Sequence, residues 1–223
     1  MAEVEEKEIL EDKFTRSRMI FGDDFSKLQS AKILLLGVGG VGSYCLDCLL
    51  RSGVTDITIV DYDSYDVTNQ NRQLHSEHHE GENKVEALSS HYSSVIAINQ
   101  KIDKEWIETF DFEPYDLILD AIDDIHAKLA LAQKCYKKLI SAVGSAKRLD
   151  PTKIEVATIY KTHGDRFGAK IRYELKKRRF NKKYPVIFSS EPAVIKEKGS
   201  FMAVTAAFGL TMCSQAIMKL QKK

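Results

Sequence analysis

The sequence has few cysteines, and they lack the spacing of a disulfide framework. There are four in 223 residues, and the first residues are acidic, unlike the basic and apolar start of a secretory signal peptide. Cys45 and Cys48 form one Cys-x-x-Cys pair, but a tetrahedral zinc site needs four ligands and the sequence has no second pair. We therefore expect a reducing, cytoplasmic environment, no structural zinc, and no cysteine acting as a nucleophile.

A hydrophobic run long enough to be a clear membrane span is also missing. The most apolar stretch, residues 201–217, is seventeen residues long and contains Thr205, Thr211, Ser214 and Gln215. A helix needs about 20 apolar residues to cross a bilayer. We expect a helix buried in the core or in a dimer interface, and no stable membrane insertion.

No large excess of one charge marks the chain, whose formal net charge is +1, but the charge is unevenly distributed. Residues 161–198 contain twelve Lys or Arg and four Asp or Glu. Such a segment is typical of proteins that bind a phosphate backbone, although a solvated helix face has the same composition. The nearby aromatic residues are either base-stacking or core residues: Phe167, Tyr173, Phe180 and Tyr184. The candidate nucleic-acid-binding residues are Lys170, Arg172, Lys176, Lys177, Arg178 and Arg179.

A glycine-rich loop follows the first strongly apolar segment. Glycines occupy the first, third and sixth positions of residues 37–42, the pattern of a dinucleotide-binding loop. They permit a tight turn, close approach of a phosphate and close packing of the next helix, whose N-terminus attracts phosphate. Asp61 ends a second apolar segment about twenty residues later, where an acid accepts hydrogen bonds from ribose. The pattern predicts a nucleotide site without distinguishing NAD from ATP. The candidate residues are Gly37, Gly39, Gly40, Gly42, Asp61 and Asp63.

Two cations favour ATP over a nicotinamide cofactor. Arg72, flanked by Asn69 and Asn71, follows the second apolar segment, and Lys84 opens the next helical segment. Both are expected to meet a phosphate chain at the carboxyl edge of the sheet, as suits phosphoryl or nucleotidyl transfer. A nicotinamide enzyme instead has to lay the ring of its cofactor against a substrate. The alternative for Lys84 is a solvated helix start.

Two acidic residues follow a third buried segment, residues 117–119. Asp120 and Asp123 occupy the place expected for a carboxylate that holds Mg²⁺. Asp123 and Asp124 could instead form an ordinary helix N-cap. A histidine cluster, His75, His78 and His79, lies in a polar loop without the spacing of a known metal site, and we interpret it as solvated or gating.

Apolar segments of strand and helix type alternate along most of the chain. This alternation predicts an α/β fold: a Rossmann-like, mostly parallel sheet with helices on both faces, extended by a C-terminal substrate-binding portion. We expect one domain, with an N-terminal arm and helix (1–30), an ATP-binding core (31–150) and a C-terminal substrate-binding portion (151–223). The predicted strands are residues 32–36, 57–60, 95–98, 117–120, 139–142 and 153–160. The predicted helices are residues 41–51, 84–93 and 127–137, a basic helix after the last strand and an apolar C-terminal helix, with a loop through Pro185 and Pro192 between these two.

Taken together, these motifs resemble the ThiF/MoeB/ubiquitin-activating-enzyme superfamily of ATP-dependent adenylyltransferases. The resemblance implies that the glycine loop and Asp61 bind ATP, that Arg72 and Lys84 hold its phosphates, and that Asp123 is the magnesium-linked carboxylate. It also matches Arg16 to an arginine that reaches the neighbouring protomer's site, which implies a homodimer; alone, Arg16 reads as a surface residue. The second half resembles the tRNA threonylcarbamoyladenosine dehydratase branch, in residues 150–154, 169–172, 188–191 and 199–209.

That resemblance implies adenylation of the side-chain carboxylate of threonylcarbamoyladenosine, next to the anticodon of tRNA, followed by ring closure. ATP and Mg²⁺ are the expected cofactors, Arg16, Arg72, Lys84 and Asp123 the catalytic residues, and a sulfur-transfer or carrier protein a possible further partner. Two alternatives stay open. One is an adenylyltransferase for the C-terminus of a ubiquitin-like sulfur carrier, and the other is an NAD-dependent oxidoreductase.

Overall fold

The protein is built around one seven-stranded sheet, seen in a computed structural model that describes residues 11–197 and 199–222. The strand order is β3-β2-β1-β4-β5-β7-β6, and only β6 runs antiparallel to its neighbour, β7. The strands are β1 (Lys32–Leu36), β2 (Asp56–Asp61), β3 (Val95–Asn99), β4 (Leu117–Asp120), β5 (Leu139–Ala142), β6 (Ile154–Thr158) and β7 (Pro185–Ser189). The predicted Rossmann-like α/β fold with a mostly parallel sheet is confirmed.

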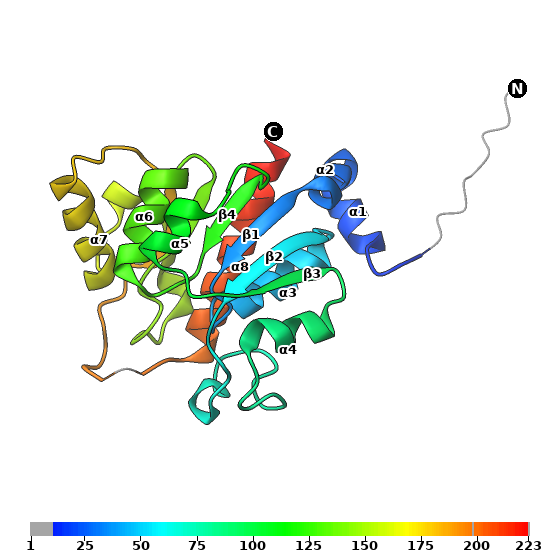
Figure 1. The fold of residues 1–223 in the computed structure, drawn as a ribbon, viewed down its shortest axis with the longest axis horizontal. Helices are drawn as coiled ribbons and strands as arrows, with labels where there is room; N and C mark the ends of the chain where they lie inside the picture. The colour runs from blue at the N-terminus through cyan, green and yellow to red at the C-terminus, as the bar shows by residue number, and fades with distance from the viewer. Residues whose placement is uncertain (1–10, 198, 223) are drawn as a thin grey trace, which may run out of the picture.

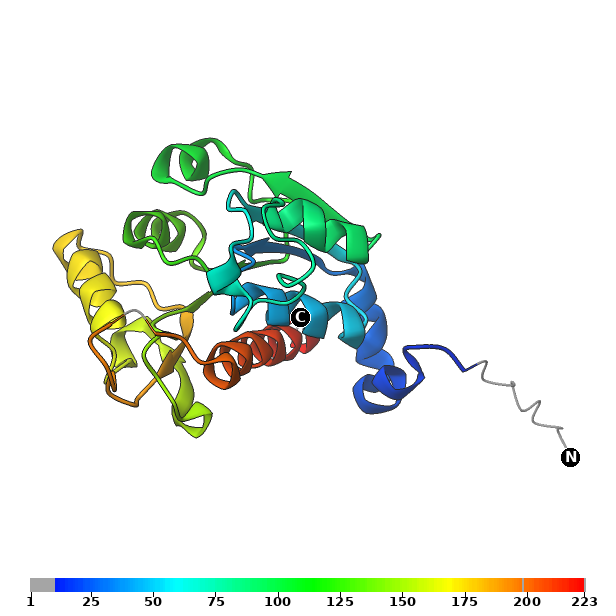
Figure 2. The same cartoon turned by 90° about the horizontal axis from the view of Figure 1, so that it is seen from below.

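Helices cover both faces of the sheet, because side chains alternate along each buried strand. Ile33 and Leu35 of β1 pack into a core with α3 (Gly42–Ser52) and α8 (Met202–Gln221). Leu34 and Leu36 pack into a second core with α5 (Lys104–Thr109), α6 (Ile125–Cys135) and α7 (Arg166–Lys177). Figures 1 and 2 show these two layers on either side of the strands. Helix α4 (Lys84–His91) also packs into the core of Ile33 and Leu35.

The chain reverses its direction of winding at β1. β2 and β3 lie on one side of β1, and β4 and β5 lie on the other. In doubly wound sheets a ligand binds in the crevice outside the carboxyl ends of the strands at such a switch point. The glycine loop leaves β1 at this position, so the fold places the loop where a ligand is expected.

The sequence prediction was wrong for the segment through Pro185, which is strand β7 and not a loop. Proline is tolerated there because the first residue of a strand need not donate to the ladder. β7 lies between β5 and β6, so the C-terminal portion shares the sheet of the core. Helix α5 was also missed, because its six residues are too few to show a clear period.

The N-terminal segment contains two short helices, α1 (Thr15–Phe21) and α2 (Phe25–Ser30), where one was predicted. The first ten residues of the predicted N-terminal arm lie outside the described residues. Ser17 of α1 donates a hydrogen bond to the carbonyl of Arg51, near the C-terminal end of α3. Helix α1 therefore lies at the end of α3 that is farther from the glycine loop.

Helix α8 is long and apolar enough to cross a membrane by length and composition, yet half of its most apolar window is buried inside the protein. A side chain on Gly209 would clash with the Val41 carbonyl and the Cys45 amide, so this glycine lets α8 lie directly against α3. The thiols of Cys45 and Cys213 are buried along this contact, and Cys135 is buried on the other side of the sheet. These positions agree with a core helix and core cysteines.

Candidate active site

The glycine loop is held in shape by backbone conformation and by Asp61. Gly37 has φ +84°, which side-chain-bearing residues rarely adopt, and a Cβ on Gly42 would overlap with the Gly37 carbonyl oxygen. Asp61, at the end of β2, accepts a hydrogen bond from the Val38 amide at 2.9 Å. A Cβ on Gly39 would meet no atom closer than 3.7 Å, so nothing in the protein requires glycine there. The open side of Gly39 instead leaves room for a ligand to approach the backbone.

The loop forms one wall of a cavity of about 880 Å³, which we call the glycine-loop cavity. Its floor lies at the carboxyl ends of β1, β2 and β4, and its rim includes residues from the β3–α5 segment and from the N-terminal end of α8. The predicted site residues that line it are Gly37, Gly39, Gly40, Asp61, Asp63, Asn69, Arg72, Lys84 and Asp123. The structure therefore brings together most of the residues chosen from sequence.

Both predicted cations line this cavity. Lys84, at the start of α4, is 5% exposed, and its Nζ lies 3.1 Å from Oδ2 of Asp63, which is itself half-exposed. Arg72 donates to the Thr68 carbonyl at 2.7 Å and to the Asn71 side chain at 2.9 Å, through the same nitrogen, Nη1. Its Nε and Nη2 make no hydrogen bond within the described part of the chain. Each cation can therefore still contact an anion in the cavity.

A hydrogen bond from the buried Tyr65 holds the loop that carries Arg72. Tyr65 is buried and its hydroxyl donates to the Leu74 carbonyl at 2.9 Å. Burial, together with the nearby Asp61 carboxylate, raises the pKa of the Tyr65 hydroxyl above its ordinary value. The hydroxyl consequently remains a neutral donor, and Arg72 stays beside the cavity.

Asp120 does not line the cavity, although the sequence placed it among the nucleotide ligands. It is fully buried, and both of its oxygens accept from Nζ of Lys128, at 2.8 and 2.9 Å. Its Oδ2 also accepts from the Ser141 hydroxyl at 2.6 Å, and its Oδ1 from the Ile122 amide at 3.2 Å. Asp120 thus anchors the end of β4 beneath the site, and direct contact with a ligand does not fit its position.

Asp123 is the acidic residue that remains available. Asp124 is the N-cap of α6 and accepts from the Ala127 amide at 2.7 Å. Asp123 is exposed in the cavity and makes no hydrogen bond or ion pair with the described residues. The N-cap alternative therefore applies to Asp124, and the carboxylate of Asp123 is left free.

Of the remaining predicted residues, Asn69 lines the cavity, whereas Asn71 and Gly42 do not line it but hold neighbouring segments in place. The Asn71 side chain donates to the Ser200 carbonyl at 3.0 Å, which ties the Arg72 loop to the segment before α8. Asn69, which does line the cavity, also accepts from the Asp66 amide at 3.3 Å. Gly42 begins α3 directly behind the loop.

Arg16 lies far from this cavity in its own protomer. It is exposed on α1, beside the distal end of α3. Helix α3 has eleven residues, and at 1.5 Å per residue it separates α1 from the glycine loop by about 16 Å. Any contact of Arg16 with the site would have to come from another subunit.

The predicted nucleic-acid-binding residues cluster on and after α7. Lys170, Lys176, Lys177, Arg178 and Arg179 are exposed, whereas Arg172 is half-buried and donates to the Thr162 hydroxyl. Of the four aromatic residues, Tyr184 is buried in the core and Tyr173 is 65% exposed. A solvent-facing basic surface with one exposed aromatic ring is what the structure provides.

Several cavity residues were missed in the sequence. Gln73 is 6% exposed and lines the cavity, and its Oε1 has no hydrogen-bond partner in the described part of the chain. Lys101 lies on the β3–α5 side, and Ser200 and Thr205 come from the C-terminal portion. Gln73 directly follows the Asn/Arg motif and could have been suspected, but the others depend on tertiary packing.

Two of the three loop histidines, His75 and His79, pack against another histidine, His91 of α4. The His75 and His91 rings stack with centroids 4.0 Å apart, and Nε2 of His79 lies 2.8 Å from Nε2 of His91. Burial and the neighbouring His91 lower the pKa of His75. His78 is exposed. Across residues 11–197 and 199–222, no group of three or more His, Cys, Asp or Glu is placed to hold a metal ion.

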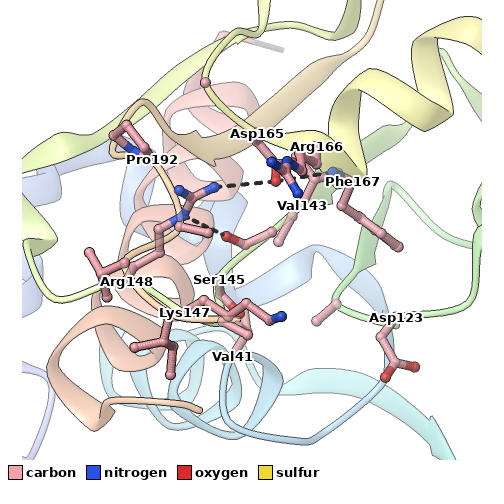
Figure 3. A pocket seen from close by; sticks show the side chains of 18 of the residues that line it. Val41, Asp123, Val143, Ser145, Lys147, Arg148, Asp165, Arg166, Phe167 and Pro192 are labelled. Atoms are coloured by element: carbon pink, nitrogen blue, oxygen red, sulfur yellow. Dashed lines mark hydrogen bonds and ion pairs between the residues drawn. The ribbon is translucent and has the colours of Figure 1, made fainter. Parts of the chain in front are cut away.

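A second cavity of about 950 Å³ adjoins the first, and we call it the side cavity (Figure 3). Three segments enclose it: residues 142–148 after β5, residues 164–167 at the start of α7, and residues 192–196 after β7. The two cavities share the wall residues Val41, Ala121, Ile122, Asp123, Ser145 and Ala146. A ligand in one cavity could therefore react with a ligand in the other.

Fold and site together define a nucleotide-binding α/β protein. A glycine loop lies at the switch point of a Rossmann-like sheet, and two cations and a free carboxylate line the cavity in front of it. The model of the ThiF family matches residues 14–223, so the chain belongs to the ThiF family.

Among relatives, the chain is similar to tRNA threonylcarbamoyladenosine dehydratases. It is 38% identical to the one from Bacillus subtilis over 196 residues, covering 82% of this chain and 77% of the relative. The structure of the Escherichia coli enzyme, TcdA, in complex with ATP matches with a TM-score of 0.89 and 28% identity, over 94% of each chain. The complex of the same enzyme with AMP also matches with a TM-score of 0.89, at 29% identity and the same coverage.

The glycine-loop cavity fits ATP and a magnesium ion by its donor set. The open face of Gly39, the unpartnered Oε1 of Gln73 and the cations Arg72 and Lys84 offer the contacts that a nucleotide with a phosphate chain needs. The free carboxylate of Asp123 is an oxygen ligand of the kind that Mg²⁺ prefers. These roles remain predictions.

Proposed function

We propose that this protein uses ATP to dehydrate threonylcarbamoyladenosine in tRNA, next to the anticodon. The observation that carries the proposal is the junction of the two cavities at Asp123, Ser145 and Ala146. A nucleotide in the glycine-loop cavity can present its α-phosphate to a substrate in the side cavity. The similarity to tRNA threonylcarbamoyladenosine dehydratases supports the choice of substrate. Because tRNA is the substrate, we expect the protein to act in the cytoplasm.

The chemistry follows from two groups on one substrate side chain. The carboxylate oxygen of the threonylcarbamoyl group bonds to the α-phosphorus of ATP while pyrophosphate leaves. The carbamoyl group of the same side chain then attacks the activated carbonyl carbon and loses a proton, and AMP leaves with the former carboxylate oxygen. The nucleoside loses one water in total. Since both reacting groups belong to one molecule, the enzyme needs no nucleophile of its own.

The protein would contribute charge and position. Arg72 and Lys84 would stabilise the negative charge that builds on the phosphate oxygens during the transfer. Asp123 would hold a magnesium ion, which neutralises phosphate charge when it is bound. The desolvated position of Lys84 strengthens its electrostatic effect compared with a cation in water.

The first test is mass spectrometry of nucleosides from threonylcarbamoyl-modified tRNA after incubation with the protein, ATP and Mg²⁺. We expect a product lighter by one water that forms only with ATP. Activity of the purified protein alone would show that no sulfur-transfer or carrier protein is needed. An unchanged nucleoside, together with ATP-dependent activation of a ubiquitin-like carrier, would move the function to carrier activation. Tight NADH binding without ATP binding would favour an oxidoreductase.

We also propose that the active form is a homodimer in which Arg16 of one protomer acts in the partner's site. Its distance from its own glycine-loop cavity supports this proposal. The test mixes two inactive variants, Arg16→Ala and Lys84→Met. Half of the dimers in a random mixture are heterodimers, and each would have one intact site, so about a quarter of wild-type activity should return. No recovery on mixing would contradict action across the dimer.

The basic surface of α7 should determine affinity for tRNA without affecting ATP. Replacing Lys176 and Lys177 by alanine removes two exposed cations outside both cavities. We expect a higher KM for tRNA and a shallower dependence of binding on salt, by about one unit of slope for each phosphate that is no longer neutralised. Lys161→Ala, an exposed lysine before α7, is a control for charge alone. An unchanged salt slope would place the tRNA elsewhere.

A further inference from the structure

A buried arginine with an unused donor lies in the side cavity. Arg148 is 4% exposed, and its Nη2 lies 3.3 Å from Oδ1 of Asp165. Its Nε donates to the Gly144 carbonyl at 3.4 Å, whereas the buried Nη1 has no hydrogen-bond partner in residues 11–197 and 199–222. Figure 3 shows the guanidinium between Asp165 and the segment that carries Pro192, within the wall of the side cavity. One donor nitrogen of a buried, ion-paired guanidinium is therefore without a partner among the described residues.

The requirements of the fold do not explain this arginine. Asp165 is the N-cap of α7 and already accepts from the Gly168 amide at 2.6 Å and from the Phe167 amide at 3.2 Å. A cap of this kind is complete without a cationic partner. Leaving Nη1 of this charged group buried without an acceptor opposes folding, and such atoms in native proteins call for an explanation. A ligand that accepts from Nη1 supplies one.

The position of Arg148 indicates which part of a substrate it would meet. Arg148 lines only the side cavity and not the glycine-loop cavity, whereas Ser145 and Ala146 line both cavities. The reacting carboxylate has to lie at the shared wall, near the phosphates. Counting from that carboxylate towards the base, the side chain continues through the α-carbon and an N–H group to the carbamoyl carbonyl, which is joined to N6 of the adenine.

We propose, on the basis of the function proposed above, that the side cavity holds the modified base and that Nη1 of Arg148 donates a hydrogen bond to the carbamoyl oxygen. Val143, Ile122 and Phe167 provide the apolar wall for a planar base, and Lys147 and Arg166 supply charge for the flanking phosphates. The base leaves the anticodon stack to enter, as in other enzymes that act on a base.

Arg148 is thereby a specificity-determining residue. Unmodified adenosine has no carbamoyl oxygen, so its entry would leave Nη1 buried and unpaired. A site built to hydrogen-bond a substrate group discriminates strongly against an analogue that lacks the group, because the polar partner is then unsatisfied. The protein would therefore act on the modified nucleoside and exclude its unmodified precursor.

The test compares three variants at the same ion pair. Arg148→Met removes the donor with similar length, Arg148→Lys keeps the charge without the planar fork, and Asp165→Asn keeps both Arg148 and a residue able to cap α7. We measure kcat and KM for modified tRNA, the affinity for an ATP analogue, and the binding of threonylcarbamoyladenosine and of adenosine to the analogue-loaded protein. Thermal unfolding identifies the variants that fold.

We expect Arg148→Met to lower kcat/KM by about ten- to hundredfold and to abolish the preference for the modified nucleoside, with unchanged affinity for the ATP analogue. Asp165→Asn leaves the arginine charge without its buried partner and should lower Tm, but the folded protein should keep the full preference for the modified nucleoside. If Asp165→Asn loses this preference as fully as Arg148→Met does, the arginine is only a structural partner and the proposal is wrong. If Arg148→Met does not fold, a preference retained by Arg148→Lys at the wild-type level overturns the proposal, and its loss supports it. A wild-type protein that removes no water from modified tRNA would instead reject the proposed function itself.

Discussion

Breaking the buried ion pair of Asp120 and Lys128 should destabilise the protein strongly. Nζ of Lys128 contacts both Asp120 oxygens, the Ala142 carbonyl at 2.8 Å and the Ser141 hydroxyl at 3.3 Å. Both side chains are 2% exposed or less. Lys128→Met leaves the carboxylate buried with two neutral donors, the Ser141 hydroxyl and the Ile122 amide. Removing one partner of a buried pair costs about 3–5 kcal/mol. For a chain of this length each kcal/mol lowers Tm by about 2–4 °C, so the expected fall is about 6–20 °C.

The matched control is the double variant Asp120→Asn with Lys128→Met, which removes both charges. It should recover a large part of the lost free energy of unfolding, because no uncompensated charge remains. Urea unfolding of the wild type, the two single variants and the double variant forms a complete cycle. The reasoning is refuted if Lys128→Met costs less than about 1 kcal/mol while Asp120→Asn abolishes ATP binding without destabilising the fold, because Asp120 would then be a ligand after all.

Three further predictions concern the site and its surroundings. Lys84→Met should cut turnover by about a hundredfold or more with little change in Tm, since the half-exposed Asp63 can be solvated instead; dehydration assays and thermal unfolding check this. Gly42→Ala should lower both ATP affinity and Tm, because its Cβ would overlap with the Gly37 carbonyl; wild-type ATP binding would contradict it. Because the pKa of His75 is lowered in the folded protein, the unfolded chain binds a proton at this residue more readily than the folded chain does. The free energy of unfolding should therefore decline as the pH falls below about 6.5, the pKa in the unfolded chain. His75→Asn, which tolerates the positive φ of this position, should lose less Tm than the wild type between pH 7.5 and 5.5.

Local motifs made the fold and much of the glycine-loop cavity predictable. The glycine loop, Asp61, Arg72 and Lys84 all follow strands at one edge of a parallel sheet, and a parallel topology brings such positions together whatever lies between them. Most strand positions could be predicted because each buried strand is a short apolar run in the sequence.

The sequence could not show that Asp120, which was predicted to bind the nucleotide together with Asp123, is buried beneath the site. Asp120 is the last residue of β4, and the lysine that neutralises it lies eight residues later, on α6. Burial of Lys128 depends on how α6 packs over β4 and β5, which is a tertiary property. The same limit hid Arg148, whose partner Asp165 is seventeen residues away.

The C-terminal portion contributes a strand to the central sheet and lining residues to both cavities. β7 inserts between β5 and β6, and residues 192–196 after β7 close the side cavity. Thr205 and Ser200 line the glycine-loop cavity, and the Ser200 carbonyl holds Asn71 beside Arg72. The position of Arg72 therefore depends on the segment that leads into α8. Because the nucleotide cavity and the side cavity share walls and are built by the same C-terminal residues, binding in one can affect the geometry of the other. Both cavities are lined by residues from the first and the second half of the chain. A change in the C-terminal segments that shifts one cavity should therefore also shift the other, which would link ATP binding to substrate binding.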